Sequence, residues 1–331
     1  MTTEATTMTH WTTSNIPPQD GRTVVVTGTG GLGFEDASAL ARAGAHVIIA
    51  GRNPKKGTEA VARIRQSVSK AHVGFMALDL ASLDSIEAFG ESLRRSLDRV
   101  DVLINNAAVM SPPMRQVTAD GFELQFGTNH LGHFALTAQL MPLLRKGNQP
   151  RVISLSSVAA RSGAIDFDNL QAERSYKPMP VYSQSKLACL MFALELQRRS
   201  DDAGWGIQSI AAHPGISRTD LLPNGAGTWS VPGVMRRTLW FLFQPAAQGA
   251  LPTLFAATSP QAQGGMYYGP DKLGETRGHP TIAKVPPQAM DPGAAARLWI
   301  ESERLTNVEF PLAKSRVPAS LRPIEESLGR V

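Results

Sequence analysis

A tyrosine and a lysine in "YSQSK", Tyr182 and Lys186, have the spacing that places two side chains on one face of a helix. A free phenol titrates near about 10, too high for a group that must exchange protons at neutral pH. A nearby ammonium favours the phenolate and lowers the pKa of the phenol, so the pair has the chemistry of a general acid or base. Tyr-x-x-x-Lys is common by chance, and alone it would usually mark an ordinary helix face.

Two further polar residues fit the same chemistry. Ser157 follows the apolar run "RVISLS", so it is expected at a carboxyl edge of the sheet, where open α/β sheets bind ligands. There its hydroxyl would hold a substrate carbonyl oxygen; the alternative is a serine in a turn. Asn129, in "GTNHLGHF", needs a hydrogen-bond partner if it is buried. Its neighbours His130 and His133 favour a helix-face or hydrogen-bonding role over a metal pair, because no cysteine supports their spacing.

A glycine-rich stretch, "VVVTGTGGLGFEDA" (24–37), has the context of a phosphate cradle because strand, loop and helix follow one another. The start of the helix offers free backbone N–H groups and a positive dipole end, and glycines let a ligand approach the backbone closely. Read from Gly28, the loop fits G-x-G-x-x-G. Read from Thr27, it fits T-G-x-x-x-G-x-G with one residue missing.

The end of the second predicted strand bears on the cofactor. NAD enzymes tend to carry an acid there that binds the ribose 2′-hydroxyl, whereas this chain has Gly51 followed by Arg52. An arginine offers a charged fork for a 2′-phosphate, which favours NADP(H) over NAD; the alternative is a solvated surface arginine. Lys55 and Lys56 are expected nearer to solvent.

Composition is typical of a soluble globular protein: 331 residues, 42% apolar and 18% charged, with a net charge of +5. The basic residues form no run longer than two, so we expect a mildly basic surface rather than a nucleic-acid partner. The single cysteine, Cys189, cannot form an internal disulfide and is expected as a packed core thiol. Without an apolar signal region or a span of about 18 apolar residues, we predict a cytoplasmic protein with no membrane span. A homo-oligomer is compatible with this composition.

Short apolar runs alternate with helical patterns, which predicts a parallel sheet covered on both faces. The predicted strands are 23–27, 46–50, 73–79, 101–105, 151–156, 207–213 and 264–270, and the predicted helices are 33–43, 54–68, 83–97, about 120–144, 182–199 and a last one opened by Asp291-Pro292. We expect a flexible segment over 1–20, one domain over 21–310 and a tail over 311–331.

The order of these motifs resembles the short-chain dehydrogenase/reductase family, and within it the retinol-dehydrogenase-like bacterial branch. The resemblance covers about residues 21 to 310. It rests on the glycine loop, "LDL", "NNAA" (105–108), "TNHLGHF", "SLSSV", "YSQSK" and "HPGISRT", which occur in family order.

This resemblance implies a Rossmann-like, doubly wound α/β domain with a seven-stranded parallel sheet, and it assigns roles by position. The implied catalytic residues are Asn129, which would support a relay water, Ser157, Tyr182 and Lys186. The implied cofactor residues are Gly28, Thr29, Gly31, Leu32, Gly33, Arg52, Asp79, Leu80, Asn106, Ala107, Ala108, Tyr182, Lys186, Pro214, Gly215 and Thr219. Asp79 would contact the adenine, Asn105 and Ala107 would flank the adenosine, and Thr219 would meet the nicotinamide amide.

Two features depart from the family pattern. The glycine loop is one residue short, so Gly28, Gly31 and Gly33 take the three glycine positions, which puts the phosphate grip in doubt. Ala108 replaces the usual last glycine of N-N-A-G. The insert "RSGAIDFDNLQAERSYKPMP" resembles the retinol-dehydrogenase branch.

Residues about 158–181 and 216–250 would wall an apolar substrate cleft. Within the second wall, "WSVPGVMRRTLWFLF" could instead be packed core or a membrane-touching helix. The expected function is NADP(H)-dependent interconversion of a carbonyl and an alcohol. The alternatives are other nicotinamide chemistry, such as C=C reduction or epimerisation, and a non-catalytic NADP(H) sensor.

Overall fold

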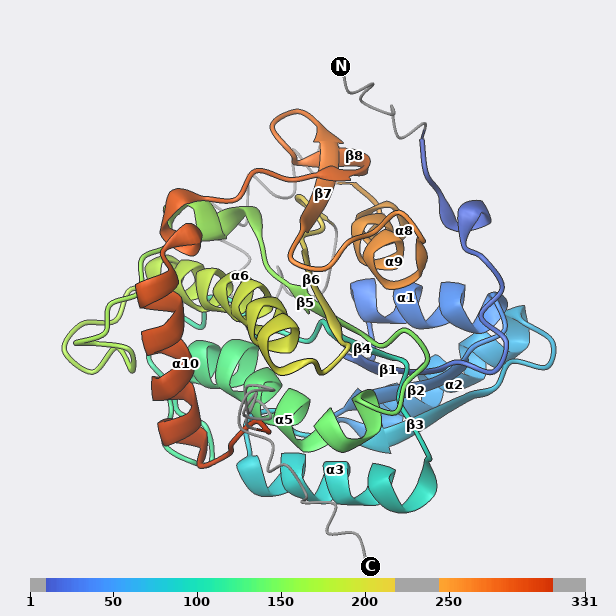
Figure 1. The fold of residues 1–331 in the computed structure, drawn as a ribbon, viewed down its shortest axis with the longest axis horizontal. Coiled ribbons are helices and arrows are strands. Elements are labelled where there is room, and N and C mark those ends of the chain that lie inside the picture. The colour runs from blue at the N-terminus through green and yellow to red at the C-terminus, as the bar shows by residue number, and fades with distance from the viewer. Residues whose placement is uncertain (1–9, 218–243, 312–331) are drawn as a thin grey trace, which may run out of the picture.

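The computed structural model describes residues 10–217 and 244–311, and its centre is one eight-stranded sheet in the order β3-β2-β1-β4-β5-β6-β7-β8 (Figure 1). The strands are β1 (Thr23–Thr27), β2 (His46–Gly51), β3 (Val73–Ala77), β4 (Val102–Asn105), β5 (Arg151–Leu155), β6 (Gln208–Ala212), β7 (Tyr267–Lys272) and β8 (Arg277–Ile282). Strands β1 to β7 pair in parallel, which confirms the predicted doubly wound sheet. The eighth strand, β8, was not predicted from the sequence, and it pairs antiparallel with β7.

The central strands are apolar over consecutive inner positions, such as Val24 to Val26 in β1, because both faces of the sheet are covered. In β1, Val24 and Val26 pack in the same core as Leu40 of α1, whereas Val25 packs on the other face with Phe134. Successive strand residues point to opposite faces, so burial of both faces removes the alternation of apolar and polar residues.

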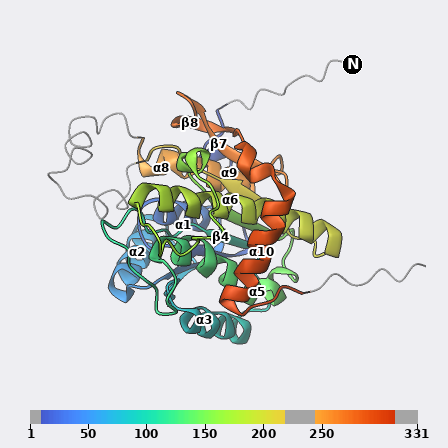
Figure 2. The same ribbon diagram turned by 90° about the vertical axis from the view of Figure 1, so that its left-hand side faces the viewer.

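The helices form a layer on each face of the sheet, with α1, α2 and α9 on one side and α3, α5 and α6 on the other (Figures 1 and 2). Their bounds are α1 (Gly31–Arg42), α2 (Pro54–Ser67), α3 (Leu83–Ser96), α4 (Leu124–Phe126), the π-helical turn η2 (Gly127–Leu131), α5 (Gly132–Leu144), α6 (Pro178–Ala203), α8 (Ala246–Gly249), α9 (Leu251–Thr258) and α10 (Pro292–Thr306); short 3-10 turns are η1 (Thr13–Asn15), η3 (Val158–Ser162) and η5 (Pro287–Met290). As predicted, Asp291 caps α10 by accepting hydrogen bonds from Gly293 and Ala294. No described helix is both long and apolar enough to cross a bilayer.

Part of the segment expected to be flexible belongs to the folded domain. Trp11 is buried and meets the ring of Phe255 edge-on, at 5.5 Å between centroids. The expectation for 1–20 is therefore wrong for residues 11–20, because one large apolar side chain fixes this stretch to α9. Residues 1–9, the tail from 312 and most of the second expected cleft wall (218–243) lie outside the described residues.

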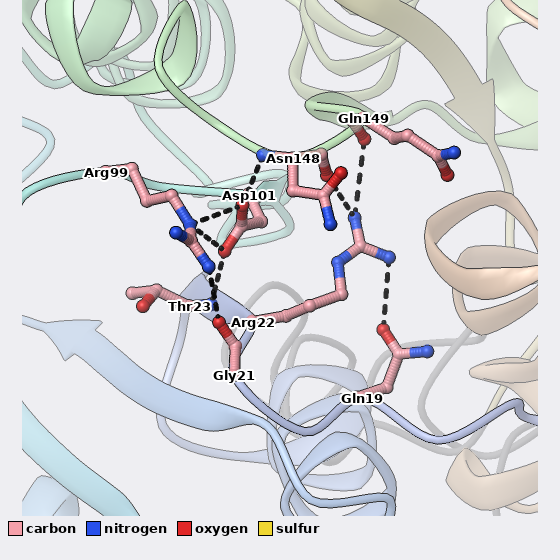
Figure 3. A network of polar contacts seen from close by, with 8 residues as sticks. All are labelled: Gln19, Gly21, Arg22, Thr23, Arg99, Asp101, Asn148 and Gln149. Carbon is pink, nitrogen blue, oxygen red and sulfur yellow. Dashed lines mark hydrogen bonds and ion pairs between the residues drawn. The ribbon is translucent and has the colours of Figure 1, made fainter.

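The buried carboxylate of Asp101 links the starts of three neighbouring strands, at the end of the sheet away from the glycine loop; Figure 3 shows its contacts. Asp101 is fully buried and accepts hydrogen bonds from the backbone N–H groups of Thr23 at 2.7 Å and Asn148 at 2.6 Å. Arg99 donates to the same carboxylate and to the carbonyl of Gly21. The network fixes the starts of β1 and β4 and the segment before β5. It thereby helps to set how these strands align, and with that the positions of their other ends beside the glycine loop.

We expect Asp101→Ala to lower the free energy of unfolding by about 2–5 kcal/mol, because it leaves two backbone N–H groups and an arginine without their acceptor. Urea denaturation measures the change. Asp98→Ala is the matched control, since Asp98 is exposed nearby and should alter stability by less than about 0.5 kcal/mol. Equal stabilities of the two variants would show that the network contributes nothing.

Candidate active site

The shortened glycine loop leads directly from β1 into the first turn of α1. Gly28 has φ +102° and Gly31 has φ +52°, conformations that side chains rarely adopt. At Gly33, a Cβ would lie 2.6 Å from Nδ2 of Asn106 and 2.7 Å from the carbonyl oxygen of Gly28. The three glycines are therefore needed for this path, and the N-terminus of α1 opens toward the loop as an anion site requires.

A neighbouring strand end holds the loop in place. Thr27 Oγ1 accepts hydrogen bonds from the N–H groups of Asn106 and Ala107, both at 2.9 Å. Asn106 Nδ2 donates to the Thr27 carbonyl at 2.7 Å. These bonds join the ends of β1 and β4, where the strand order of the sheet reverses and where ligands of such folds bind.

A cavity of about 720 Å³ opens at this edge, and it brings together most of the predicted site residues. The predicted residues that line it are Gly28, Thr29, Gly31, Leu32, Asn106, Ala107, Ala108, Ser157, Tyr182, Lys186, Pro214 and Gly215. Its size suits a ligand of dinucleotide dimensions. The glycine loop thus lies in one cavity with the tyrosine, lysine and serine.

Six described residues that the sequence predicted for the site are not among those that line the cavity. Gly33 packs behind the loop against Asn106. Asp79 accepts a hydrogen bond from Ala81 in a turn after β3, and Leu80 beside it is buried. Arg52 is exposed at the end of β2, and Asn129 is fully buried. Asn105 is also buried, where it donates to Thr137, and Thr219 lies outside the described residues.

Burial dominates the electrostatics of the tyrosine. It raises the pKa of Tyr182 to about 12, while the adjacent Ser157 hydroxyl acts in the opposite direction. Burial also lowers the pKa of Lys186, whose ammonium donates to the Leu155 carbonyl at 3.0 Å. The expectation that Lys186 brings the phenol below its ordinary pKa is therefore not met here, because loss of hydration outweighs the favourable interactions.

Asn129 joins α6 to the loop after β4 instead of facing the cavity. Its Nδ2 donates to Ser185 Oγ at 2.9 Å, and its side chain makes two hydrogen bonds with the backbone of Val109. Its own carbonyl, in the π-helical turn, accepts from His133 Nδ1 at 2.9 Å and from the Cys189 thiol at 3.1 Å. Cys189 is buried, as expected of a packed thiol.

The two histidines in this stretch make hydrogen bonds. His133 Nε2 lies 2.9 Å from Thr27 Oγ1, which already accepts two N–H groups, so the threonine donates to the ring. His130 Nε2 lies 2.8 Å from Ser302 Oγ in α10. Burial lowers the pKa of His133 to about 4 and that of His130 to about 3, so both rings are neutral at physiological pH.

Other residues of the cavity were not predicted as site residues. Lys56 and Arg63 of α2 line it, although Lys56 was expected near solvent. The helical spacing turns Lys56, Glu59, Ala60 and Arg63 toward the glycine loop, and that periodicity was the available signal. Met110, Met179 and Ile216 add apolar surface near Ser157 and Tyr182.

Comparisons with known proteins agree with this geometry. Residues 22–226 match the family model of the short chain dehydrogenases. The chain is 39% identical to retinol dehydrogenase 13 of Homo sapiens over 303 residues, 89% of this chain and 88% of that protein. It is 37% identical to polyprenol dehydrogenase of Mus musculus over 298 residues, 88% and 85% of the two chains.

Solved structures share the fold. An uncharacterised protein from Mycobacterium paratuberculosis aligns with a TM-score of 0.77 at 40% identity, over 92% of this chain and 100% of that chain. A short chain dehydrogenase from Shigella flexneri, solved in complex with NADP, aligns with a TM-score of 0.60 at 21% identity, over 76% of this chain and 97% of that chain. The second likeness concerns the fold alone.

Proposed function

Because this chain belongs to the short-chain dehydrogenase/reductase family, we propose that it is an NADP(H)-dependent oxidoreductase that interconverts an apolar alcohol and its carbonyl form. The observation that supports this most directly is the single cavity shared by the glycine loop, Ser157, Tyr182 and Lys186. A structural serine and an ordinary helix face would have no reason to meet at a phosphate cradle.

The cradle fits a dinucleotide. Gly28 to Leu32 offer backbone N–H groups at the start of α1 to a pyrophosphate, and Asn106 to Ala108 line the path from there toward Tyr182. Lys186 and Pro214–Gly215 line the remote end, where the nicotinamide ribose and ring would lie. When bound, the nicotinamide supplies or accepts the hydride.

The protein's own groups handle the substrate oxygen. Ser157 is placed to donate a hydrogen bond to it, and Tyr182 to exchange a proton with it. With a pKa of about 12, the phenol is protonated at neutral pH and is ready to donate to the alkoxide that forms during carbonyl reduction. The buried Lys186 ammonium, the one cation of α6 that lines the cavity, adds positive charge beside the reacting atoms.

The choice of NADP(H) rests on charge at the end of the cavity near β2. Gly51 leaves no acid there to repel a 2′-phosphate, and Arg52 follows it with an exposed side chain. Lys56 and Arg63 add two cations that line the cavity, and Glu59 is the one carboxylate among the lining residues. The guanidinium of Arg63 stacks on Phe34 of α1 at 4.1 Å from the ring centroid, which fixes its position beside the loop.

The other end of the cavity suits an apolar substrate. Leu155, Val158, Met110, Met179 and Ile216 line the cavity there, and methionines adapt to irregular apolar ligands. The names of two relatives refer to retinol and polyprenol, which are long isoprenoid alcohols. We therefore propose an apolar alcohol or aldehyde of similar character as the substrate.

A panel of aldehydes, ketones and their alcohols, followed by NADPH absorbance, tests this function. We expect turnover with apolar aldehydes or alcohols and much weaker turnover with small polar ones. NADPH binding without turnover of any member would contradict the proposal and favour the non-catalytic alternative. Reduction of a C=C bond, or epimerisation, would favour the other family chemistries.

The high pKa of the Tyr182 phenol predicts different pH dependences for carbonyl reduction and alcohol oxidation. Reduction needs the protonated phenol, so its kcat/KM should stay level between pH 6 and 10. Oxidation needs the phenolate, whose fraction rises tenfold per pH unit below a pKa of about 12, so its kcat/KM should rise with a slope near one. Initial rates in both directions at constant ionic strength measure this. A plateau of the oxidation rate below pH 8 would show that burial does not control the phenol.

A further inference from the structure

The turn between β7 and β8 has an unusual backbone. Leu273, Gly274 and Glu275 follow one another with φ values of +49°, +66° and +67°. Side chains other than glycine rarely adopt this region, so surrounding contacts must hold Leu273 and Glu275 there. The turn also lies beyond the part of the chain that matches the family model, which ends at residue 226.

Glu275 supplies those contacts through its carboxylate. His213 Nε2 lies 3.0 Å from Oε2, Arg161 forms an ion pair with the same oxygen, and the Lys284 N–H donates to Oε1 at 3.0 Å. The side chain of His213 is fully buried and that of Glu275 is 19% exposed. One carboxylate therefore joins the segment after β8, the residue after β6 and the turn η3.

The hydrogen bonds determine the tautomer of His213. The Gly215 N–H donates to Nδ1 at 3.2 Å, so Nδ1 must accept. The ring proton is therefore on Nε2, where it is donated to Glu275. Burial lowers the pKa of His213 although Glu275 opposes this, which agrees with a neutral ring.

Both partners of Glu275 belong to walls of the cavity. Arg161 lies in η3, the turn that directly follows Ser157, and it also donates to the Gly274 carbonyl at 3.0 Å. His213 immediately precedes Pro214 and Gly215, which line the cavity. The two walls, which the backbone bond from the Ser156 N–H to the Ala212 carbonyl already joins at the ends of β5 and β6, are thus also linked through the side chain of Glu275.

The backbone of the turn between β7 and β8 also packs against the Pro214–Gly215 wall. Gly215 has φ +63°, and a Cβ there would run into the carbonyl of Thr276. That carbonyl accepts a hydrogen bond from the Ile216 N–H at 2.8 Å. The position of residues 214 to 216 therefore depends directly on the turn.

We propose that Glu275 is a positioning residue that fixes the Ser157 wall and the Pro214–Gly215 wall relative to each other for catalysis. The inference rests on the proposed function, since these walls would hold the substrate oxygen and the nicotinamide end. A misplacement of about 1 Å at a reacting centre can cost on the order of 100-fold in rate. Loss of the carboxylate should therefore reduce turnover more than cofactor binding.

The test compares Glu275→Ala and Glu275→Gln with Leu273→Ala, which changes the same turn at a side chain that is 71% exposed. Cofactor titration gives the NADPH Kd and the number of binding sites, and kcat is expressed per binding site. We expect Glu275→Ala to lower this kcat about 10- to 100-fold, the scale of a small misplacement, with the Kd changed less than about threefold. Glu275→Gln should lie in between, and Leu273→Ala should match the unmodified enzyme.

A total activity that falls only in proportion to the number of binding sites, with kcat per site unchanged, would overturn the proposal, because it would reflect folding alone. A spectroscopic readout keeps the test independent of turnover. In ¹⁵N spectra of histidine-labelled enzyme, assigned with His213→Asn, we expect the Nε2–H tautomer. In Glu275→Ala we expect a shift of the Nε2 resonance, because Nε2–H loses its acceptor while the Gly215 N–H still holds Nδ1 as an acceptor.

If the unmodified enzyme reduces no carbonyl, the proposed function fails, but the positioning role is still decided by the emission of bound NADPH. That emission should change in Glu275→Ala and not in Leu273→Ala. Unchanged emission together with an unchanged Nε2 resonance of His213 would reject the role of Glu275.

Discussion

Tyr182→Phe should lower kcat by at least about 100-fold, the scale of a lost general acid, while NADPH affinity stays nearly constant. The phenol is buried in the cavity wall, so phenylalanine keeps the packing of the ring and removes only the hydroxyl. Ser157 and Lys186 remain in place to bind substrate and cofactor. Turnover with excess enzyme and a titration of NADPH fluorescence give the two quantities.

Tyr176→Phe provides the matched control. The Tyr176 hydroxyl donates to the Pro112 carbonyl at 2.7 Å, but Tyr176 is not among the residues that line the cavity. The hydroxyl also accepts a hydrogen bond from Gln125 Nε2 at 3.3 Å, so its loss should lower stability by about 1–3 kcal/mol and leave kcat within about threefold. A Tyr182→Phe enzyme that is as active as the Tyr176→Phe enzyme would refute the proposed role of Tyr182.

The second large effect concerns cofactor preference, where the unmodified enzyme should favour NADPH over NADH by roughly 10- to 150-fold. This range corresponds to about 1.5–3 kcal/mol for charge-assisted hydrogen bonds to the 2′-phosphate. Arg52→Ala and Lys56→Ala should each lower the ratio by weakening NADPH, with little change for NADH. Lys55→Ala is the matched control, because Lys55 is exposed and is not among the residues that line the cavity.

Gly51→Asp should reverse the preference, because a carboxylate there accepts from the ribose 2′-hydroxyl and repels a 2′-phosphate. A Cβ at this position would lie 2.8 Å from Cγ2 of Thr29, a methyl group that a rotation of the side chain can move away. The measurement is kcat/KM for both cofactors at fixed salt. Equal use of NADH and NADPH by the unmodified enzyme would show that none of these cations contacts the cofactor.

The sequence was sufficient for the parallel sheet because burial on both faces leaves continuous apolar runs such as 24–26 and 47–50. It did not reveal β8, whose sequence "RGHPTI" contains a glycine and a proline and whose residues are mostly half-exposed. An edge strand paired on one side needs no apolar run. Trp11 was missed for a related reason, since one buried side chain in a polar segment has no periodicity.

Within the site, local motifs predicted which residues meet, and long-range contacts decided the rest. The ends of parallel strands brought Gly28, Asn106 and Ser157 together, and the first turns of α6 added Tyr182. The phenol pKa depends on how much water the whole fold excludes, which spacing in a helix does not report. Glu275 contacts His213 and Arg161, which precede it in the chain by 62 and 114 positions, so no local sequence pattern indicates these contacts.

Transfer of deuterium from NADPH labelled at C4 of the nicotinamide tests the central claim most directly. The enzyme would be incubated with the labelled cofactor and an apolar aldehyde, and the products analysed by mass spectrometry. We predict an alcohol that carries one deuterium on the former carbonyl carbon, formed in equal amount to NADP⁺ and almost absent with Tyr182→Phe. An enzyme that binds the labelled NADPH but leaves it unchanged, or an alcohol that forms without deuterium, would contradict the account.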